Sequence, residues 1–85
     1  MITGSQIRIA RHALRWSAEE LSSKAGIASK TVRRIEAGDG VPNSTAQTLM
    51  SIQSSLESAG IEFIGTPDDG PGIRIYSSSS DPSST

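Results

Sequence analysis

The sequence predicts a small, mainly α-helical domain with a short β-hairpin near its C-terminus. Three observations lead to this expectation. Helix-start signals recur along the first 45 residues, glycines stand where helices should stop, and the hydrophobic period changes to that of strands after Gly60. At 85 residues the chain has room for one domain. Because only 34% of its residues are apolar, we expect a second copy or another partner to help bury its surface.

The expected helices begin at capping signals and end at glycines. Three pairs have the spacing of a capping box: Thr3 with Gln6, Ser17 with Glu20, and Ser44 with Gln47. Three apolar pairs flank helix starts at staple spacing: Ile2 with Ile7, Trp16 with Leu21, and Ile27 with Val32. We therefore predict helices over residues 4–14, 18–25, about 29–37 (with a start near Ala28 or Ser29) and 45–59. Gly26, Gly38 and Gly60 follow the last three of them, and Gly26 suits a left-handed C-cap.

The hairpin is predicted from alternating residues after Gly60. Residues 61–64 and 72–76 alternate as short strands, and the turn-forming stretch 65–71 between them suits a loose loop. Since a lone two-stranded hairpin is marginal in water, we expect it to pack on the helices or on another chain. The chain thus divides into a helical part (1–60), a hairpin (61–76) and a Ser-rich tail (77–85) that should be disordered.

The composition argues against an enzyme. There is no Cys, and His12 is the only histidine, so no catalytic residue, metal ligand or cofactor site is predicted. The glycine-containing stretch 65–72 lacks the lysine of a phosphate-binding loop and carries Asp68 and Asp69, which would repel phosphate. No apolar run approaches the roughly 18 residues of a membrane span and no signal peptide is visible, so we expect a cytoplasmic binding module without membrane contact.

The charge is distributed unevenly along the chain. The formal net charge is −1, but residues 1–36 hold seven cations against three acids, a net +4, and residues 37–85 hold one cation against six acids, a net −5. Such asymmetry hints at a part that binds a polyanion. On charge alone, however, a solvated helical surface that happens to be basic is the simpler interpretation.

Residues 18–37 have the pattern of a DNA-reading helix-turn-helix. This motif needs two short helices at a steep angle, with apolar residues at fixed offsets and a glycine in the turn. The buried offsets hold apolar residues: Leu21, Ala25, Ile27, Val32 and Ile35. Ser22 is the small residue at the helix crossing and Gly26 is the turn glycine. A generic helical hairpin would not require a glycine at that position.

Residues 6–38, together with the ending Arg34-Ile35-Glu36-Ala37-Gly38, resemble the Cro/C1-type (XRE-family) helix-turn-helix of phage repressors. Residues 42–56 resemble the helices that follow in that domain, so the likeness covers about two thirds of the chain. The resemblance implies a lambda-repressor-like bundle of four to five helices in a bacterial or phage protein of the nucleoid. It also implies a dimeric transcription regulator, mostly a repressor or autoregulator, and strand-forming tails like residues 59–74 occur in many short members.

The resemblance assigns base contacts to the third helix. Ser29, Lys30 and Arg33 stand where family members touch base edges. Arg33 is the first candidate for specificity, since a bidentate contact of Arg with guanine discriminates by about 1–3 kcal/mol. Lys30 suits a base or a phosphate equally well, and Ser29 suits either a contact or an N-cap.

Phosphate contacts are expected from helix N-termini and flanking side chains: Arg15, Ser17, Thr31, Arg34 and the loop after Gly38. Arg34 is the weakest of these candidates, because its position beside Ile35 also allows it to turn toward the fourth helix. Ala18 and Ala28 depart from the family pattern, which has polar residues there, and Asp39 stands in a loop that is often basic.

The resemblance also implies a structural ion pair and a dimer. Arg11 and Glu36 occupy the positions of a buried salt bridge between the first and third helices, which makes Arg11 part of the scaffold. Four apolar residues of the hairpin should share one face and serve in dimerisation: Ile61, Phe63, Ile73 and Ile75. A two-fold homodimer would place two reading helices roughly 34 Å apart and favour a palindromic DNA operator.

A second class of function remains open. The same scaffold could serve as an antitoxin or antiactivator that mainly binds another protein, a toxin or an activator. The acidic second half, the hairpin and the missing polar residues at positions 18 and 28 favour this alternative.

Overall fold

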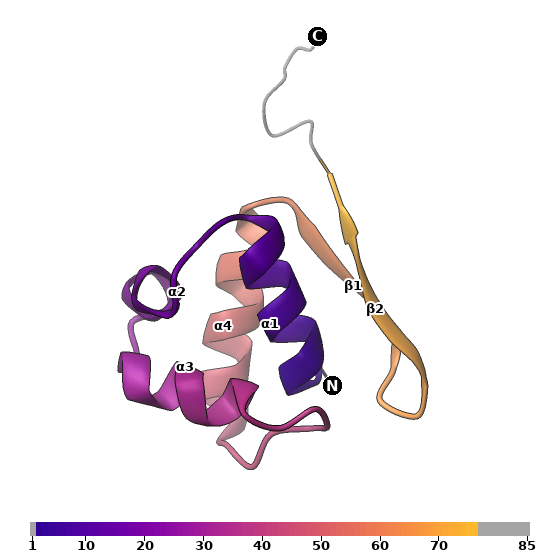
Figure 1. Ribbon diagram of the computed structural model, residues 1–85, viewed down its shortest axis with the longest axis horizontal. Coiled ribbons are helices and arrows are strands. Elements are labelled where there is room, and N and C mark those ends of the chain that lie inside the picture. The colour runs from indigo at the N-terminus through magenta and orange to yellow at the C-terminus, as the bar shows by residue number, and fades with distance from the viewer. Residues whose placement is uncertain (1, 77–85) are drawn as a thin grey trace, which may run out of the picture.

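The computed structural model of the chain describes residues 2–76, which form four helices and an antiparallel two-stranded hairpin. The elements are α1 (Gly4–Ala13), α2 (Ala18–Ala25), α3 (Ser29–Glu36), α4 (Ala46–Ser58), β1 (Ile61–Thr66) and β2 (Asp69–Ile75). Helices α1 and α4 lie together in the middle, with α2 and α3 on one side of them and the hairpin on the other (Figure 1). The predicted class, mainly helical with a C-terminal hairpin, is confirmed. The tail expected to be disordered, residues 77–85, lies outside the described residues.

Two of the three predicted capping boxes are present. The Thr3 hydroxyl accepts from the Gln6 backbone N–H at 3.1 Å, and the Gln6 side-chain oxygen accepts from the Thr3 N–H at 2.9 Å. At α2, Ser17 and Glu20 form the same reciprocal pair, with distances of 3.0 and 2.8 Å. These bonds satisfy donors that the first turn of each helix would otherwise leave free, so the starts of α1 and α2 lie where the sequence predicts.

The third predicted capping box, at Ser44, is wrong. Helix α4 is capped one residue later by Thr45, whose hydroxyl accepts from the Thr48 N–H at 3.2 Å. The hydroxyl of Ser44 instead accepts from the side chain of Arg34 at 3.1 Å. Ser44 and Thr45 both carry a hydroxyl that could cap the helix. In the structure Thr45 is the cap, and Ser44 binds Arg34.

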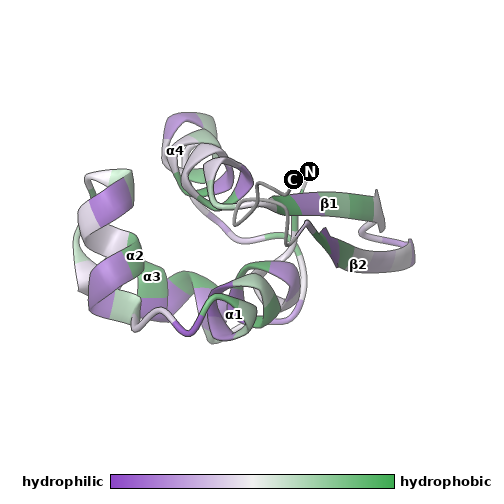
Figure 2. Ribbon diagram, turned by 90° about the horizontal axis from the view of Figure 1, so that it is seen from above, coloured by the Kyte–Doolittle hydropathy of each residue, from purple (hydrophilic) through white to green (hydrophobic). Residues whose placement is uncertain are grey.

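The core lies where the two central helices meet the other elements. Its buried apolar residues come from every helix and from β1: Ile2, Ile7, Ala10, Leu21, Val32, Ile35, Leu49, Ile52, Leu56 and Ile61. Trp16 and Ile27, two of the predicted staple residues, are partly buried against it. Figure 2 shows hydrophilic stretches along α2 and α3, on the side of the molecule away from the hairpin. No helix within residues 2–76 combines the length and apolar character that a membrane span requires.

The hairpin is longer and tighter than the sequence suggested. Its strands extend into the stretch expected to form a loose loop, which leaves only residues 67–68 as the turn. The register shifts between Ile64 and Thr66, where Gly65 has a φ of 76°. A glycine in this left-handed conformation accommodates a β-bulge, and pairing therefore resumes between Thr66 and Asp69. The loop prediction failed because residue composition does not reveal a bulge.

A buried glutamine ties the hairpin to α1. The side chain of Gln6 donates to the carbonyl of Ile64 at 3.1 Å and to the carbonyl of Gly72 at 2.7 Å, and Gln6 is only 3% exposed. The same side chain caps α1 with its oxygen. An amide can accept on one side and donate on the other, whereas a carboxylate only accepts.

We predict that Gln6→Glu destabilises the protein by about 3 kcal/mol, because it removes two hydrogen bonds and places a charge against two buried carbonyls. The capping box survives in this variant, since Glu is equally suited to it. Urea unfolding followed by circular dichroism measures the effect. Gln47→Glu makes the same exchange at an exposed position of α4 and should leave the free energy of unfolding nearly unchanged. Equal effects of the two exchanges would contradict the bridging role of Gln6.

The start of α1 rests on the end of α3. The Gly4 N–H donates to the carbonyl of Gly40 at 2.9 Å, and a Cβ at position 4 would overlap the carbonyl oxygens of Ile35 and Gly38. The close approach is therefore possible only for glycine. It fixes the position of α3 relative to α1 at the end opposite to the α2–α3 turn.

We predict that Gly4→Ala costs about 1–3 kcal/mol of unfolding free energy, as expected when an added methyl group forces packed backbone apart. The matched control is Gly38→Ala, because a Cβ at position 38 would meet no atom within 4 Å. Thermal denaturation of both variants provides the comparison. If Gly4→Ala were as stable as the control, the contact between α1 and the end of α3 would be looser than described.

Candidate nucleic-acid interface

Helices α2 and α3 form a unit held together by a tight turn. Gly26 has a φ of 71°, and the N–H groups of Gly26 and Ile27 donate to the carbonyls of Ser23 and Ser22 at 3.3 and 3.0 Å. This is the hydrogen-bond pattern of a Schellman motif, in which glycine avoids the cost of the left-handed conformation. The inner side of the unit is apolar and buried: Leu21, Val32 and Ile35 are at most 3% exposed. The predicted turn glycine is thus confirmed, and so are three of the five buried offsets, whereas Ala25 and Ile27 are only partly buried against the core.

The outer side of α3 presents cations. Lys30, Arg33 and Arg34 are exposed, while Ser29 and Thr31 are half-buried. Ala28 is the N-cap and makes no side-chain hydrogen bond, so Ser29 is the first helical residue and not the cap. The structure thereby places the three predicted base-contact residues, Ser29, Lys30 and Arg33, in the first five positions of one short helix.

Two of these cations already have partners within the chain. Arg33 forms an ion pair with Glu19 of α2, and both side chains remain more than half exposed. Arg34 donates to the carbonyl of Asn43 and to the hydroxyl of Ser44, each at 3.1 Å. Arg34, predicted as a phosphate contact, thus turns toward the loop before α4, which was the alternative that its position beside Ile35 allowed. Within residues 2–76, Lys30 takes part in no ion pair.

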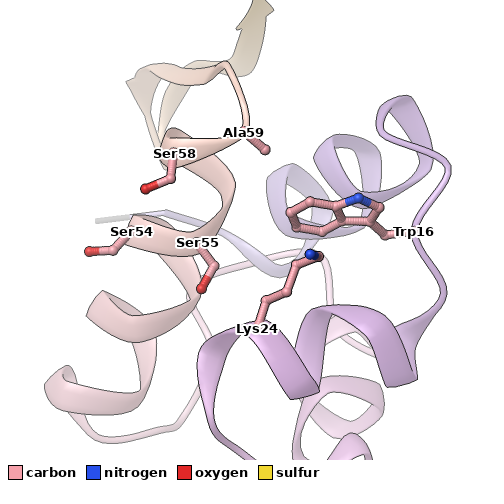
Figure 3. Close-up of a pocket in the computed structure, with 6 residues that line it drawn as sticks. All are labelled: Trp16, Lys24, Ser54, Ser55, Ser58 and Ala59. Carbon is pink, nitrogen blue, oxygen red and sulfur yellow. The ribbon is translucent and has the colours of Figure 1, made fainter. Parts of the chain in front are cut away.

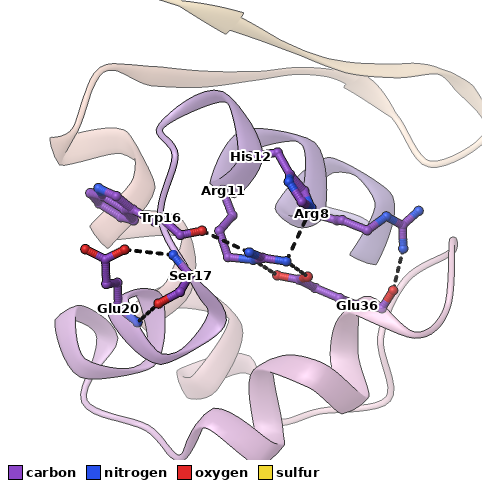
Figure 4. A network of polar contacts seen from close by, with 7 residues as sticks. All are labelled: Arg8, Arg11, His12, Trp16, Ser17, Glu20 and Glu36. Carbon is purple, nitrogen blue, oxygen red and sulfur yellow. Dashed lines mark hydrogen bonds and ion pairs between the residues drawn. The ribbon is translucent and has the colours of Figure 1, made fainter.

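The predicted structural ion pair is present and nearly buried. Arg11 donates from Nε and Nη2 to the two carboxylate oxygens of Glu36 at 2.9 and 2.8 Å, with side-chain exposures of 14% and 8%. Its Nη1 also donates to the carbonyl of Trp16 at 2.9 Å, beside the Ser17–Glu20 cap of α2 (Figure 4). The hydrogen bond to Glu36 raises the pKa of Arg11 further, against the effect of burial. Arg11 is therefore part of the scaffold.

A second arginine of α1 extends this network. Arg8 donates to the backbone carbonyl of Glu36 and forms an ion pair with Asp39 at 2.9 Å (Figure 4 shows the contact with Glu36). The acidic residue after Gly38 thus neutralises a nearby arginine. Sequence reasoning missed this contact, because the two residues lie 31 positions apart.

Arg15 occupies a strained backbone position between α1 and α2. Its φ is 60°, the left-handed region, and within residues 2–76 it is the one non-glycine residue with a positive φ. The N–H groups of Arg15 and Trp16 donate to the carbonyls of His12 and Arg11, each at 3.0 Å, which closes α1 with a Schellman motif. Glycine is the usual residue at this point of the motif. A long cationic side chain there costs stability, and such strain is common at functional sites.

We predict that Arg15→Gly raises the free energy of unfolding by about 0.5–1 kcal/mol. Glycine relieves the strain of the left-handed conformation, but part of this gain is lost because glycine increases the entropy of the unfolded chain. Arg15→Ala removes the same charge but keeps the strain, so it should give no increase. Chemical denaturation of the three proteins at one pH separates strain from charge. A similar gain in both variants would assign the effect to charge repulsion instead.

The four hairpin residues predicted for dimerisation do share one face. Ile61 pairs with Ile75 and Phe63 pairs with Ile73. That face, however, packs on the helices of the same chain: Ile61 is 3% exposed, and Phe63 and Ile73 are partly buried against the core. Among the four, only Ile75 is exposed, at 55%. The helical core is small, and the hairpin covers the part of its apolar surface that would otherwise be exposed.

The opposite face of the hairpin is polar. Tyr76 donates its hydroxyl to Glu62 at 2.6 Å, and Arg74 pairs with the same carboxylate at 3.1 Å. The hydrogen bond from Tyr76 is the main reason why the pKa of Glu62 lies below its usual value, and the charge of Arg74 lowers it further. These contacts keep a charged side chain on each strand, which is a common protection of exposed strand edges.

An open pocket of about 400 Å³ lies between Trp16 and the C-terminal half of α4. Lys24 of α2 lies with its ammonium group 4.9 Å from the centre of the Trp16 ring, and the hydroxyls of α4 complete the lining (Figure 3). The indole is thus engaged by a cation on one side and partly packed against the core, which agrees with its expected role as a staple. Among the described residues, no cluster of His, Asp and Glu could hold a metal ion.

No protein-family model matches the chain, and no curated protein sequence matches it.

Proposed function

We propose that the protein is a sequence-specific DNA-binding transcription regulator that inserts α3 into the major groove. The observation that carries the proposal is the α2–α3 unit, in which a glycine turn joins a buried apolar side to a projecting helix with three exposed cations. A helix of this size fits the major groove, and Arg or Lys can donate there to guanine O6 and N7. Within this proposal the fold is lambda-repressor-like, and the protein is similar to Cro/C1-type (XRE-family) regulators.

Phosphate contacts in this arrangement come from the edges of the unit. Ser17 lies at the start of α2, Thr31 is in the first turn of α3, and Arg15 lies just before α2. No side chain caps α3, so its first backbone N–H groups are available to a phosphate oxygen. The strain at Arg15 supports its inclusion, because a glycine there would give a more stable fold but no charge.

A homodimer on a palindromic operator is the assembly that this function favours. Two copies of α3 related by a two-fold axis read half-sites one turn of DNA apart. Since most of the inner hairpin face is covered by the chain's own helices, a dimer formed through the hairpin would use its edges and the region of Ile75. The proposed role is that of a cytoplasmic bacterial or phage repressor, often of its own promoter.

A protein-interaction role is the second candidate, and one specific observation favours it. Several cations of the basic half are neutralised within the chain: Arg8 by Asp39, Arg11 by Glu36 and Arg33 by Glu19. This leaves less free positive charge for DNA than the sequence alone suggested. An antitoxin or antiactivator would bind a toxin or an activator through such a mixed surface, and the neighbouring open reading frame would name the partner class.

We predict that Arg33→Ala lowers the affinity for the preferred duplex by about 1–3 kcal/mol and relaxes its base preference, because one base contact is lost. Lys30→Ala should weaken binding to all sequences alike, with a salt slope smaller by about one, if its ammonium holds a phosphate. Fluorescence anisotropy with a duplex selected from a random pool, at several salt concentrations, measures both effects. Wild-type log K for the selected duplex should fall linearly with log salt, with a slope set by the number of phosphates that the protein contacts.

The matched control is Arg74→Ala, which removes an exposed arginine from the hairpin, on the other side of the molecule from α3. It should leave base preference intact. If neither Arg33→Ala nor Lys30→Ala changed DNA binding at low salt, the assignment of α3 as the reading helix would be wrong. Absence of any salt-dependent binding by the wild-type protein would favour the protein-interaction role.

A further inference from the structure

The ion pair between Glu19 and Arg33 crosses from α2 to α3 at the proposed reading surface. Glu19 is in the first turn of α2 and Arg33 is in the last turn of α3, so the pair links the two helices at their exposed sides. Both side chains are close to 60% exposed. An exposed pair of this kind adds little to stability, typically about 0.2–1 kcal/mol, so it is a weak structural element.

The pair leaves most of the arginine free to bind. Only Nη2 of Arg33 contacts the carboxylate, through one oxygen of Glu19. A guanidinium group has five N–H donors arranged on two edges that share Nη2, so the second N–H of Nη2 and its neighbour on that edge stay free for a guanine. Holding one end of a long, flexible side chain removes rotamer freedom before DNA arrives, and this lowers the cost of forming a bidentate contact.

The same carboxylate is unfavourable for general DNA binding. Glu19 is two residues after Ser17, at the helix start where a phosphate contact is proposed, and a negative charge there repels the backbone of any duplex. Non-specific affinity depends almost entirely on charge, whereas specific affinity also depends on base contacts. A residue that positions a base-reading arginine and repels phosphate therefore improves discrimination at the expense of affinity.

We propose that Glu19 is a specificity-determining positioning residue, which orients Arg33 toward a guanine and lowers the affinity for all other DNA. This inference rests on the proposed function. It differs from a structural role, because it concerns the ratio of specific to non-specific affinity and not the stability of the fold.

The test compares Glu19→Gln with Glu20→Gln in the full chain. Both variants remove one negative charge from the first turn of α2, and Gln at position 20 preserves the capping box with Ser17. The probes are the duplex selected from a random pool by the wild-type protein and a scrambled duplex of the same composition. For each protein, anisotropy titrations at fixed salt give both affinities and their ratio.

We expect both variants to bind the scrambled duplex about threefold more tightly, because each loses one phosphate-repelling charge. Only Glu19→Gln should also lower the ratio of selected to scrambled affinity, by about fivefold. This is the effect expected if one bidentate contact loses about half of the free energy by which it discriminates between bases. In an Arg33→Ala background, Glu19→Gln should leave the ratio unchanged, since the side chain that it positions is absent.

Three results would overturn the inference. An equal ratio for the wild type and Glu19→Gln would show that the pair does not orient the arginine. Glu19→Gln could lower the ratio by the same factor in the Arg33→Ala background, or it could change the base preference in a way that Arg33→Ala does not. Either result would mean that Glu19 itself reads a base, for example a cytosine amino group. Failure of the wild type to bind either duplex would instead overturn the proposed function, and this inference with it.

Discussion

The bidentate ion pair between Arg11 and Glu36 is the contact on which the arrangement of helices depends. The pair joins the last turn of α1 to the last turn of α3. The remaining terminal nitrogen of Arg11, Nη1, donates to the carbonyl of Trp16 just before α2 begins. Three helices therefore meet at one guanidinium group. Such a pair contributes little net stability, because desolvation offsets the attraction, but losing one partner strands a charge and costs about 3–5 kcal/mol. Its two parallel hydrogen bonds are directional, so they define how the ends of α1 and α3 lie relative to each other more strictly than apolar packing does.

Polar contacts and close backbone approaches recur throughout this fold because the apolar core is small. Gln6 caps α1 and binds two hairpin carbonyls, and Gly4 lets α1 touch the end of α3. Each of these residues uses a property that its nearest substitute lacks: an amide both donates and accepts, and a glycine has no Cβ. The hairpin packs on α1 and α4, so most of its apolar face is covered by helices of the same chain. A dimer, if formed through the hairpin, has to use what this packing leaves exposed.

Local signals in the sequence predicted most of the fold, and long-range contacts account for what they missed. The starts of α1 and α2 and the left-handed turn at Gly26 follow from residues within four positions of one another, so they can be read directly. The cap of α4 was misplaced by one residue because Ser44 is taken by Arg34. The resemblance placed Arg33 among the expected base contacts, but nothing in the sequence indicated that Glu19, 14 residues earlier, would pair with it. Periodicity predicts the face of a side chain, whereas its partner depends on how two elements pack.

The internal pairing of cations changes what the charge asymmetry means for DNA. In residues 1–36 the net charge of +4 suggested a broadly basic surface, yet Arg8, Arg11 and Arg33 each lie against a carboxylate and Arg34 is bound to a loop. Lys24 lies over the Trp16 ring, so within residues 2–76 Arg15 and Lys30 are the cations of this segment without such an engagement. If the protein binds DNA as proposed, few free cations release few counterions, so non-specific binding should be weak and shallow in its salt dependence. Under the proposed function, affinity has to come mainly from base contacts at the right sequence, and an arginine held in position then contributes more than an additional positive charge would.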